Sequence, residues 1–361
     1  MIQNIWHRYS IWNGRRNDIS NIKGKLQQCE AKPLSKGQKT DIISYFERQT
    51  GKRVPVYWHE YFFSRNGNFD VKYIPTCLYH SDIVYRLNNY KLRHAYVDKG
   101  VYDVFFPDIN RPKTIVKNIN GYFYDGEKSI TPSEAYERCK NIPSAVIKPT
   151  QEGMWGEGVL VFSSKEGFLE EGKHMSDLLN SYGKNYIIQE KVEQSEVMNR
   201  LNPTSLNTLR VLSYRHNQEV HILYVVVRIG RKGKNVDNET AGGINADIDL
   251  QTGKIVDCAY GMPKEKQIFS TDIGTVLKGY EIPSYKSVIN IVKELHLRLP
   301  YFNLIGWDFG IDKHDNPILI EWNRCPDLSQ TAHGPAFGEL TEEILSVVRT
   351  KINTRFEGSP L

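Results

Sequence analysis

Three oxygen-bearing side chains near the C-terminal end of the chain, Asp308, Glu321 and Asn323, have the types and spacing of a metal site. They lie in two strand patterns separated by a polar turn. Side chains alternate between the faces of a strand, so pairing of Ile311 with Ile318 would place Asp308 opposite Glu321. Two facing carboxylates repel each other unless a cation lies between them. Carboxylate and amide oxygens are the ligands that magnesium prefers, so this hairpin predicts a magnesium site.

The residues that flank these ligands fit the same interpretation. Gly306 and Gly310 share one face of the first strand with the aspartate, and they are expected to leave open space beside the carboxylates. In the second strand, Ile318, Ile320 and Trp322 are expected to point to the opposite face. The alternative is a half-exposed hairpin whose polar face binds nothing.

A second candidate site is a lysine followed by a glycine-rich loop, within residues 144–164 (SAVIKPTQEGMWGEGVLVFSS). Lys148 ends an apolar strand, and Gly153, Gly156 and Gly158 follow it. Glycines let backbone N–H groups approach a phosphate closely, and a lysine adds a positive charge. The lysine precedes the glycines, which differs from a Walker loop, and the glycine spacing differs from the dinucleotide-binding pattern. A phosphate-binding loop and a plain hairpin connection both remain open.

Two arginines, Arg210 and Arg228, lie inside the two long strands expected within residues 207–230. An arginine in a strand is often a rim residue whose aliphatic stem packs on its neighbours. Beside a candidate phosphate loop, however, a pair of guanidinium groups favours an anion clamp, because their donors match phosphate and carboxylate oxygens.

The overall composition limits the possible classes. A chain of 361 residues is too long for one simple core, so two or three subdomains are expected. The net charge of +5 fits an anionic substrate, and without a dense Lys/Arg block it does not point to nucleic acid. No apolar run is long enough to span a membrane, and the N-terminus has no signal-peptide core. Five scattered cysteines predict neither disulfides nor a zinc site, so we expect a cytoplasmic protein.

Local patterns predict the elements that must position these residues. Residues 1–80 are expected to contain one short helix, at 41–49, and otherwise to be irregular. Residues 337–352 are expected to form a closing amphipathic helix. The remaining expected elements are a hairpin turned at Asn120-Gly121, helices over 132–140 (capped by Thr131) and 175–182, a hairpin turned at Thr252-Gly253, and a helix after Pro283 with an apolar stripe of Tyr285, Val288, Ile289, Val292, Leu295 and Leu299.

Several segments, taken together and in order, resemble the sugar-transfer-associated ATP-grasp proteins of bacterial polysaccharide gene clusters. The resemblance covers roughly residues 85 to 340. Each segment is weak alone, and their number and order make the set specific. The segments are DKGVYDVFFP (98–107), VIKPTQEGMWGEGV (146–159), NTLRVLSYR (207–215), VRIGRKGKNVDNETAGGI (227–244) and GWDFGI with ILIEWNRCPDL (306–311 and 318–328).

The resemblance implies an α+β protein with the ATP-grasp fold, in which two α+β subdomains grip ATP and an N-terminal region forms a cap. The expected ranges are a basic and aromatic cap over 1–84, the N-terminal part of the ATP-grasp fold over 85–143, a lid subdomain with the glycine-rich loop over 144–193, and a C-terminal subdomain with the metal site over 194–361.

The resemblance also implies roles for the candidate residues. Lys99 and Lys148 would contact the phosphates of ATP, with Lys91 an alternative to Lys99, and the loop from Gln151 to Gly158 would close over them. The metal triad would carry two magnesium ions, and the two arginines would stabilise the transferred phosphoryl group. The better-known D-alanine–D-alanine ligases have an arginine two residues before the metal aspartate, where this chain has Gly306. Residues expected at the nucleoside are Gln189, Glu190 and Val192 for adenine and Glu193 for the ribose.

The implied reaction is ligation of a carboxylate to an amine through an acyl phosphate, which a closing loop would protect from water. Asn207, Asp237 and Asn238 are the expected substrate contacts. The polysaccharide setting suggests a small-molecule or sugar-linked carboxylate, with partners in polysaccharide assembly. Two alternatives stay open, namely an ATP-dependent small-molecule kinase and a nucleotide-binding scaffold of a glycan assembly complex. The sequence predicts no oligomeric state.

Overall fold

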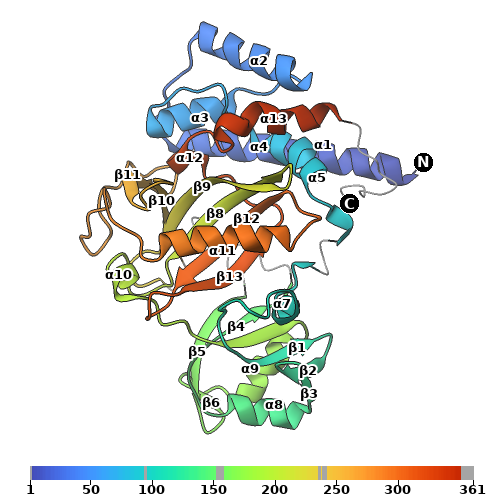
Figure 1. Ribbon diagram of the computed structural model, residues 1–361, viewed down its shortest axis with the longest axis vertical. Helices are drawn as coiled ribbons and strands as arrows, with labels where there is room; N and C mark the ends of the chain where they lie inside the picture. Colours follow the sequence, from blue (N-terminus) through green and yellow to red (C-terminus); the bar gives the residue numbers. More distant parts are fainter. Residues whose placement is uncertain (1, 93–95, 152–157, 235–236, 238–241, 351–361) are drawn as a thin grey trace.

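The computed structural model describes residues 2–92, 96–151, 158–234, 237 and 242–350. These residues form two antiparallel sheets and a helical layer, which confirms the expected α+β class. In Figure 1 the lid sheet lies at one end of the molecule, the C-terminal sheet in the middle, and the N-terminal helices at the other end. No helix among the described residues is both long and apolar enough to cross a lipid bilayer.

The lid is a seven-stranded sheet in the order β3-β2-β1-β7-β4-β5-β6. Two helices, α8 (Pro132–Cys139) and α9 (Met175–Tyr182), pack on one face and enclose a core with the buried residues of β4 and β7. The strands of two expected ranges, 85–143 and 144–193, pair within this single sheet. Its strands are β1 (Thr114–Ile119), β2 (Tyr122–Asp125), β3 (Lys128–Ile130), β4 (Ile142–Pro149), β5 (Leu160–Lys165), β6 (Phe168–Leu169) and β7 (Tyr186–Glu190).

Local sequence signals in the lid predict its elements well. The β1–β2 turn lies at Asn120 and Gly121, whose φ angles of 52° and 94° are the positive values that a tight hairpin turn requires. Helix α8 begins after Thr131, which forms a capping box with Glu134. The expected helix over 175–182 is confirmed as α9.

The C-terminal sheet has six strands in the order β11-β10-β9-β8-β12-β13. Helix α11 (Tyr285–Leu297) covers one face, where Val288, Val292 and Leu295 pack with Trp307 in the main core, as the predicted stripe requires. The strands are β8 (Thr208–His216), β9 (Glu219–Ile229), β10 (Ile244–Ile248), β11 (Ile255–Tyr260), β12 (Leu304–Ile311) and β13 (Pro317–Asn323), and the short helix α10 (Glu196–Asn199) precedes them.

The N-terminal region is mostly helical, so the expectation of an irregular region around one short helix was wrong. Among the described apolar side chains of the first helix, those from residue 9 onward, Ile19, Ile22 and Leu26 pack in the core of the cap, which makes the apolar periodicity too weak to recognise. The helices of this cap are α1 (Ile2–Gln28), α2 (Lys36–Thr50), α3 (Tyr57–Asn66), α4 (Thr76–Leu78) and α5 (Val84–Leu87), with a π-helical segment at Tyr79–Ile83.

The cap lies over part of the C-terminal sheet, on the face opposite α11 (Figure 1). Phe46 and Ile74 of the cap share one core with Leu212 and Tyr224 of the sheet. The C-terminal segment joins the same core as α12 (Gln330–His333) and α13 (Thr341–Ser346). The single closing helix expected over 337–352 is instead divided, because 3-10 turns at Gly338–Leu340 and Val347–Arg349 flank α13.

Because this core is shared, the cap should contribute to the stability of the whole subdomain. Phe46 is fully buried, and Phe46→Ala is expected to lower the free energy of unfolding by about 3–5 kcal/mol. The same substitution at Phe168, which is half exposed, should change it by less than about 0.5 kcal/mol. Urea unfolding followed by circular dichroism measures both, and equal effects would show that the cap does not depend on this core.

Candidate active site

The hairpin of β12 and β13 carries the three predicted metal ligands in the predicted register. Asp308 pairs with Glu321 and Gly306 pairs with Asn323. The register then shifts by one residue, so that Ile311 pairs with Pro317 and not with Ile318. The predicted pairing is therefore confirmed at the carboxylates and wrong at the turn.

The register shift is a bulge at Ile320, where two residues of β13 oppose one step of β12. A bulge reverses the alternation of side chains beyond it. Ile318 consequently pairs with Gly310 on the face of the carboxylates, while Leu319 joins Trp322 in the core. The expected face of Ile318 was wrong for this reason.

The expectation that the glycines beside the carboxylates leave open space was wrong. A Cβ atom at Gly306 would lie 2.5 Å from Cβ of Pro326 and 3.5 Å from Cδ of Arg210. A Cβ atom at Gly310 would lie within 3.4 Å of Ile318 and Leu206. Both glycines are needed because neighbouring side chains pack directly on the strand, and at Gly306 the nearest of these is Pro326.

Asp308 is buried between two arginines. Arg210 donates two hydrogen bonds to it, from Nε to Oδ1 and from NH2 to Oδ2, each 2.7 Å long, and Arg228 NH1 lies 3.5 Å from Oδ1. Burial opposes ionisation, but the charges of Arg210 and Arg228 outweigh it and hold the pKa of Asp308 below its usual value. Asn323 donates an Nδ2 hydrogen bond of 3.1 Å to Asp308 Oδ2, which fixes the orientation of its amide.

Two lysines from the lid side approach the other carboxylate. Lys99 Nζ lies 3.2 Å from Glu321 Oε2. Burial, and then the neighbouring charge of Lys99, lowers the pKa of Lys148 to about 8, while Glu321 opposes the shift. Lys91 is exposed, which favours Lys99 as the lysine of this site. The residues predicted as phosphate contacts and as metal ligands therefore meet where Lys99 contacts Glu321.

The sequence interpretation missed the residues that brace Lys99. Lys99 begins a 3-10 turn whose N-cap is Asp98. The backbone N–H of Lys99 donates a 3.0 Å hydrogen bond to the carbonyl of Thr150. The Asp98 carboxylate also accepts a 2.6 Å hydrogen bond from Gln151 Nε2. These contacts tie the turn to the end of β4, next to Lys148. The only signal in the sequence was the aspartate at an N-cap position.

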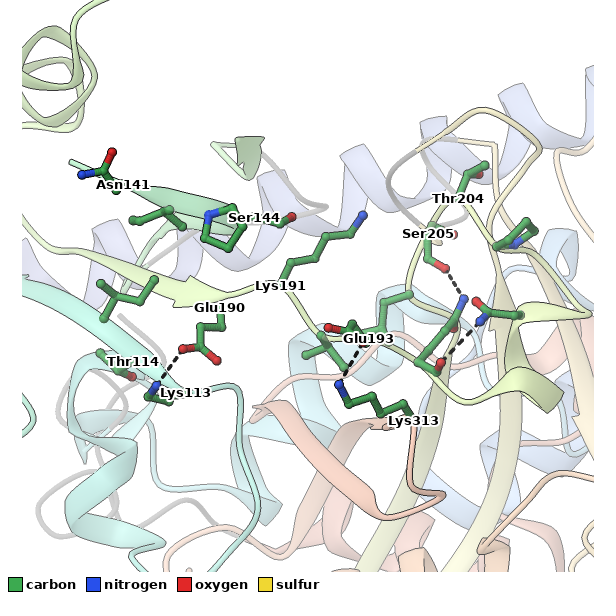
Figure 2. A pocket seen from close by; sticks show the side chains of 18 of the residues that line it. Lys113, Thr114, Asn141, Ser144, Glu190, Lys191, Glu193, Thr204, Ser205 and Lys313 are labelled. Carbon is green, nitrogen blue, oxygen red and sulfur yellow. Dashed lines mark hydrogen bonds and ion pairs between the residues drawn. The ribbon is translucent and has the colours of Figure 1, made fainter. Parts of the chain in front are cut away.

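At the hinge, residues 190–194, a pocket of about 990 Å³ lies between the lid and the C-terminal subdomain. Glu190, Val192 and Glu193 line it, and Figure 2 shows the Lys191 side chain extending into the space between Ser144 and Ser205. Lys99, Lys148 and the carboxylate pair are not among its lining residues. The pocket therefore adjoins the predicted nucleoside contacts, and the predicted phosphate site lies apart from it.

The side chains at the hinge are engaged in contacts of their own. Glu190 pairs with Lys113 at 2.8 Å and Glu193 with Lys313 at 3.0 Å, both near the surface. Gln189 is buried, and its amide donates to the carbonyl of Pro112, so it braces β7 against β1 and does not face the pocket. Any nucleoside contact in this region must use the backbone or displace these exposed ion pairs.

The expected substrate contacts separate into different environments. Asn207 is fully buried, and its Nδ2 donates to the carbonyls of Met198 and Asn202 and to Oε1 of Gln194, so the geometry gives it a structural role in holding the 194–207 segment. Asp237 accepts a hydrogen bond from Thr208 Oγ1, and burial raises its pKa to about 6 against the opposing charge of Arg228.

The remaining expected site residues belong to the lid loop and to the loop after β9. Gly153, Gly156 and Asn238 lie outside the described residues. Gly158 is described, and it is exposed with a φ of 71°, a conformation that favours glycine. Its carbonyl accepts a 2.8 Å hydrogen bond from Tyr182, which fixes this end of the loop.

The donors at the carboxylates fit a hard divalent cation. Asp308, Glu321 and Asn323 supply oxygen atoms, and the Lys99 ammonium group is a cation already paired with Glu321. No group of three His, Cys, Asp or Glu side chains within the described ranges could hold a metal by itself. Magnesium commonly binds through one or two carboxylates together with phosphate oxygens, so this donor set suits a metal that arrives with a phosphate ligand.

Comparisons with known proteins identify a family for the chain. A family model described as sugar-transfer associated ATP-grasp matches residues 82–344. No curated protein sequence matches the chain. Among solved structures, D-alanyl-alanine synthetase A from Vibrio cholerae is 16% identical over 70% of this chain and 63% of its own, with a TM-score of 0.39.

Two further solved structures are comparably distant. A D-cycloserine synthetase is 14% identical over 71% of this chain and 72% of its own, with a TM-score of 0.42. The biotin carboxylase domain of the 2-oxoglutarate carboxylase from Hydrogenobacter thermophilus, solved with MgADP, ADP and bicarbonate, is 12% identical over 74% of this chain and 49% of its own, with a TM-score of 0.43. The chain thus spans less than two thirds of the Vibrio cholerae and Hydrogenobacter thermophilus proteins.

Proposed function

Because the chain belongs to the sugar-transfer-associated ATP-grasp family, we propose that it is an ATP- and magnesium-dependent ligase that joins a carboxylate to an amine through an acyl phosphate. The observation that carries the proposal is that Lys99 contacts Glu321 and both charges act on Lys148, while Arg210 holds Asp308 beside them. Such a site offers positive charge to phosphates on one side and oxygen ligands to a metal on the other.

In this proposal the lid holds the nucleotide. Lys148 and Lys99 contact the phosphates, and the loop that ends at Gly158 covers them. The backbone from Glu190 to Val192 receives the adenine, and Glu193 leaves Lys313 to bind the ribose. The support is that the hinge pocket borders these residues and that their present ion pairs are near the surface, where they contribute little energy.

Asp308, Glu321 and Asn323 would hold magnesium. When bound, the metal supplies positive charge that neutralises the phosphate oxygens. Arg210 keeps Asp308 ionised and in place, and Arg228 faces the cleft, where its charge can stabilise the phosphoryl group and the developing oxyanion. Lys99 would exchange its contact with Glu321 for a phosphate oxygen when the nucleotide enters.

The proposed substrates are a sugar acid and an amine in the synthesis of a bacterial surface polysaccharide. The support is the description of the family, since the side chains of the cleft fit carboxylates in general. Asp237 remains a proposed substrate contact beside Arg228.

One assay separates the proposed ligase from a kinase and from a non-catalytic scaffold. The protein is incubated with ATP, magnesium and D-glucuronate, D-galacturonate or their UDP-linked forms, with and without L-alanine, L-serine, L-lysine or ethanolamine, and the products are identified by mass spectrometry. ADP with an amide supports the ligase. ADP with a stable phosphorylated acid indicates a kinase, and ATP binding without turnover of any acid contradicts both enzymes.

The lowered pKa of Lys148 predicts a pH dependence of ATP binding. Lys148 is charged below about pH 8 and loses its proton as the pH rises through that value. Because phosphate binds the charged form, the dissociation constant of ATP should be nearly constant from pH 6.5 to 7.5 and then rise by about tenfold per pH unit above 8. Titration calorimetry of Lys148→Met should give weaker binding without this rise, and a wild-type constant that stays flat to pH 9.5 would contradict the assignment.

A further inference from the structure

The face of the C-terminal sheet that carries the arginines also carries a second pair of titratable side chains, beyond the buried Val226. Arg210 pairs with Val226 on β9, and Val226 pairs with Asp247 on β10. Directly opposed residues of an antiparallel sheet point to the same face. Neighbouring strands are about 4.8 Å apart, so Asp247 lies about 10 Å across the sheet from the arginine that holds Asp308.

Helix α12 places His333 directly over this position. His333 Nδ1 lies 2.8 Å from Asp247 Oδ1, and the imidazole stacks on the ring of Tyr224, with centroids 5.0 Å apart and an interplanar angle of 30°. The side chains of His333 and Asp247 are 21% and 18% exposed. The ring is therefore fixed on two sides but still reaches solvent.

The contact with Asp247 determines which nitrogen of His333 can act as a base. A carboxylate only accepts hydrogen bonds, so Nδ1 carries the proton, and in the neutral ring Nε2 keeps its lone pair. The carboxylates of the metal site are engaged differently, because Asp308 is held by Arg210 and Glu321 faces Lys99. His333 is thus a base of fixed orientation on the same face as the arginines, and the mechanism above does not use it.

We propose that His333, oriented by Asp247, lines the subsite of the amine acceptor and removes the proton from the attacking nitrogen. This inference rests on the proposed function. In the step, the amine nitrogen forms a C–N bond with the carbonyl carbon of the acyl phosphate. The C–O bond to the phosphoryl group breaks with its electron pair, which leaves on inorganic phosphate. The proton lost by the nitrogen passes to Nε2 of His333 and then to solvent.

The charges on this face of the C-terminal sheet support separate positions for the acyl phosphate and the amine. Arg210 and Arg228 lie on the side of the metal ligands, where the anionic phosphate and carboxylate are proposed to bind. Asp247 lies on the far side, where a negative charge attracts an ammonium group before it is deprotonated. The ligand class of the subsite is therefore a primary amine. Asp247 is a positioning residue in this scheme, because it acts through His333.

Hydroxylamine separates the two half-reactions, since it is largely unprotonated at neutral pH and needs no base to attack an acyl phosphate. Wild type, His333→Gln and Asp247→Asn are compared at pH 7 with the acid and the amine that wild type accepts, and again with hydroxylamine in place of the amine. We expect amide formation to fall about 100-fold in His333→Gln and about tenfold in Asp247→Asn, while hydroxamate formation stays within about twofold of wild type.

Two additional variants keep the result open to contradiction. Added imidazole should restore part of the amide formation of His333→Ala, which a purely structural defect would not allow. His314→Gln, the same substitution at an exposed position in the β12–β13 turn, is the matched control and should form amide at the wild-type rate. Equal losses of amide and hydroxamate in His333→Gln, or wild-type amide formation in that variant, would each overturn the inference. A wild-type protein that turns over none of the acids instead contradicts the proposed function itself.

Discussion

Glu321→Gln is expected to lower the magnesium-dependent turnover of ATP by at least about 100-fold while leaving the fold intact. Replacing a group that only supports a metal ligand lowers metal affinity or activity by about 10–100-fold, and here a charged ligand itself is lost. Glu321 is 31% exposed on a strand whose opposite neighbour is already neutralised by arginine, so its uncharged analogue should fold normally. Turnover is measured by ADP release over a range of magnesium concentrations.

A matched substitution tests whether the effect belongs to the metal site. Glu339→Gln changes the same group at an exposed position in the 3-10 turn before α13, and should leave turnover and melting temperature unchanged. High magnesium should restore part of the activity of Glu321→Gln if the variant only binds the metal more weakly. Wild-type turnover in Glu321→Gln at all magnesium concentrations would remove Glu321 from the site.

The alternation of strand side chains predicted the register at the carboxylates, because that rule depends only on local geometry. The same rule failed three residues from Glu321, since the bulge at Ile320 moves Ile318 to the other face. The sequence does not indicate the bulge, because Ile318, Leu319 and Ile320 are all apolar and show no alternation that a bulge could interrupt. The face of a strand can therefore be predicted only as far as its first irregularity.

The contacts that make the site are mostly distant in sequence. Arg210 and Asp308 are 98 residues apart, and the sequence could indicate only that each residue type suits an anion or a metal. The space beside Gly306 is filled by Pro326, since a Cβ atom at that glycine would lie 2.5 Å from Cβ of Pro326. A contact between a strand and a later part of the chain cannot be recognised from the motif alone.

The cap shows a different limit. Its helices bury their apolar residues against one another and against β8 and β9, so a helix of the cap can be stable without a wide apolar stripe. Helix α2 was recognised in part because it does have an apolar stripe, in which Ile42, Tyr45 and Phe46 are buried. The long α1 was missed because most of its described side chains, over residues 9–28, face solvent.

The buried pair of Arg210 and Asp308 predicts the largest combined effect on stability and activity. Both side chains are only 6% exposed, so Arg210→Met leaves a carboxylate buried without its bidentate partner. The free energy of unfolding should fall by about 3–5 kcal/mol. ATP turnover should fall by about 100- to 1000-fold, because a preorganised charge next to the phosphoryl group is removed. Arg210→Lys should have stability and turnover between those of wild type and Arg210→Met, since lysine keeps the positive charge but cannot donate two parallel hydrogen bonds to Asp308.

The pH dependence of this loss follows from the direction of the Asp308 shift. Its pKa in the folded protein is depressed, so the pair contributes stability that is present above the unfolded value of about 3.9 and is lost as the pH falls through the folded pKa. In Arg210→Met the burial of Asp308 is no longer offset by Arg210, so its pKa should rise. The difference between wild type and the variant should therefore be largest near neutral pH and shrink as the pH falls into the acid range. Urea unfolding at several pH values measures it.

The double variant Arg210→Met/Asp308→Asn separates the two roles of the pair. Removing both charges eliminates the buried unpaired carboxylate, so most of the lost stability should return. Turnover should stay as low as in Arg210→Met or fall further, because Asp308 is also a proposed metal ligand. Recovery of activity together with stability would mean that the pair only supports the fold. Stability that recovers without activity requires that Arg210 and Asp308 act on the bound nucleotide and its metal.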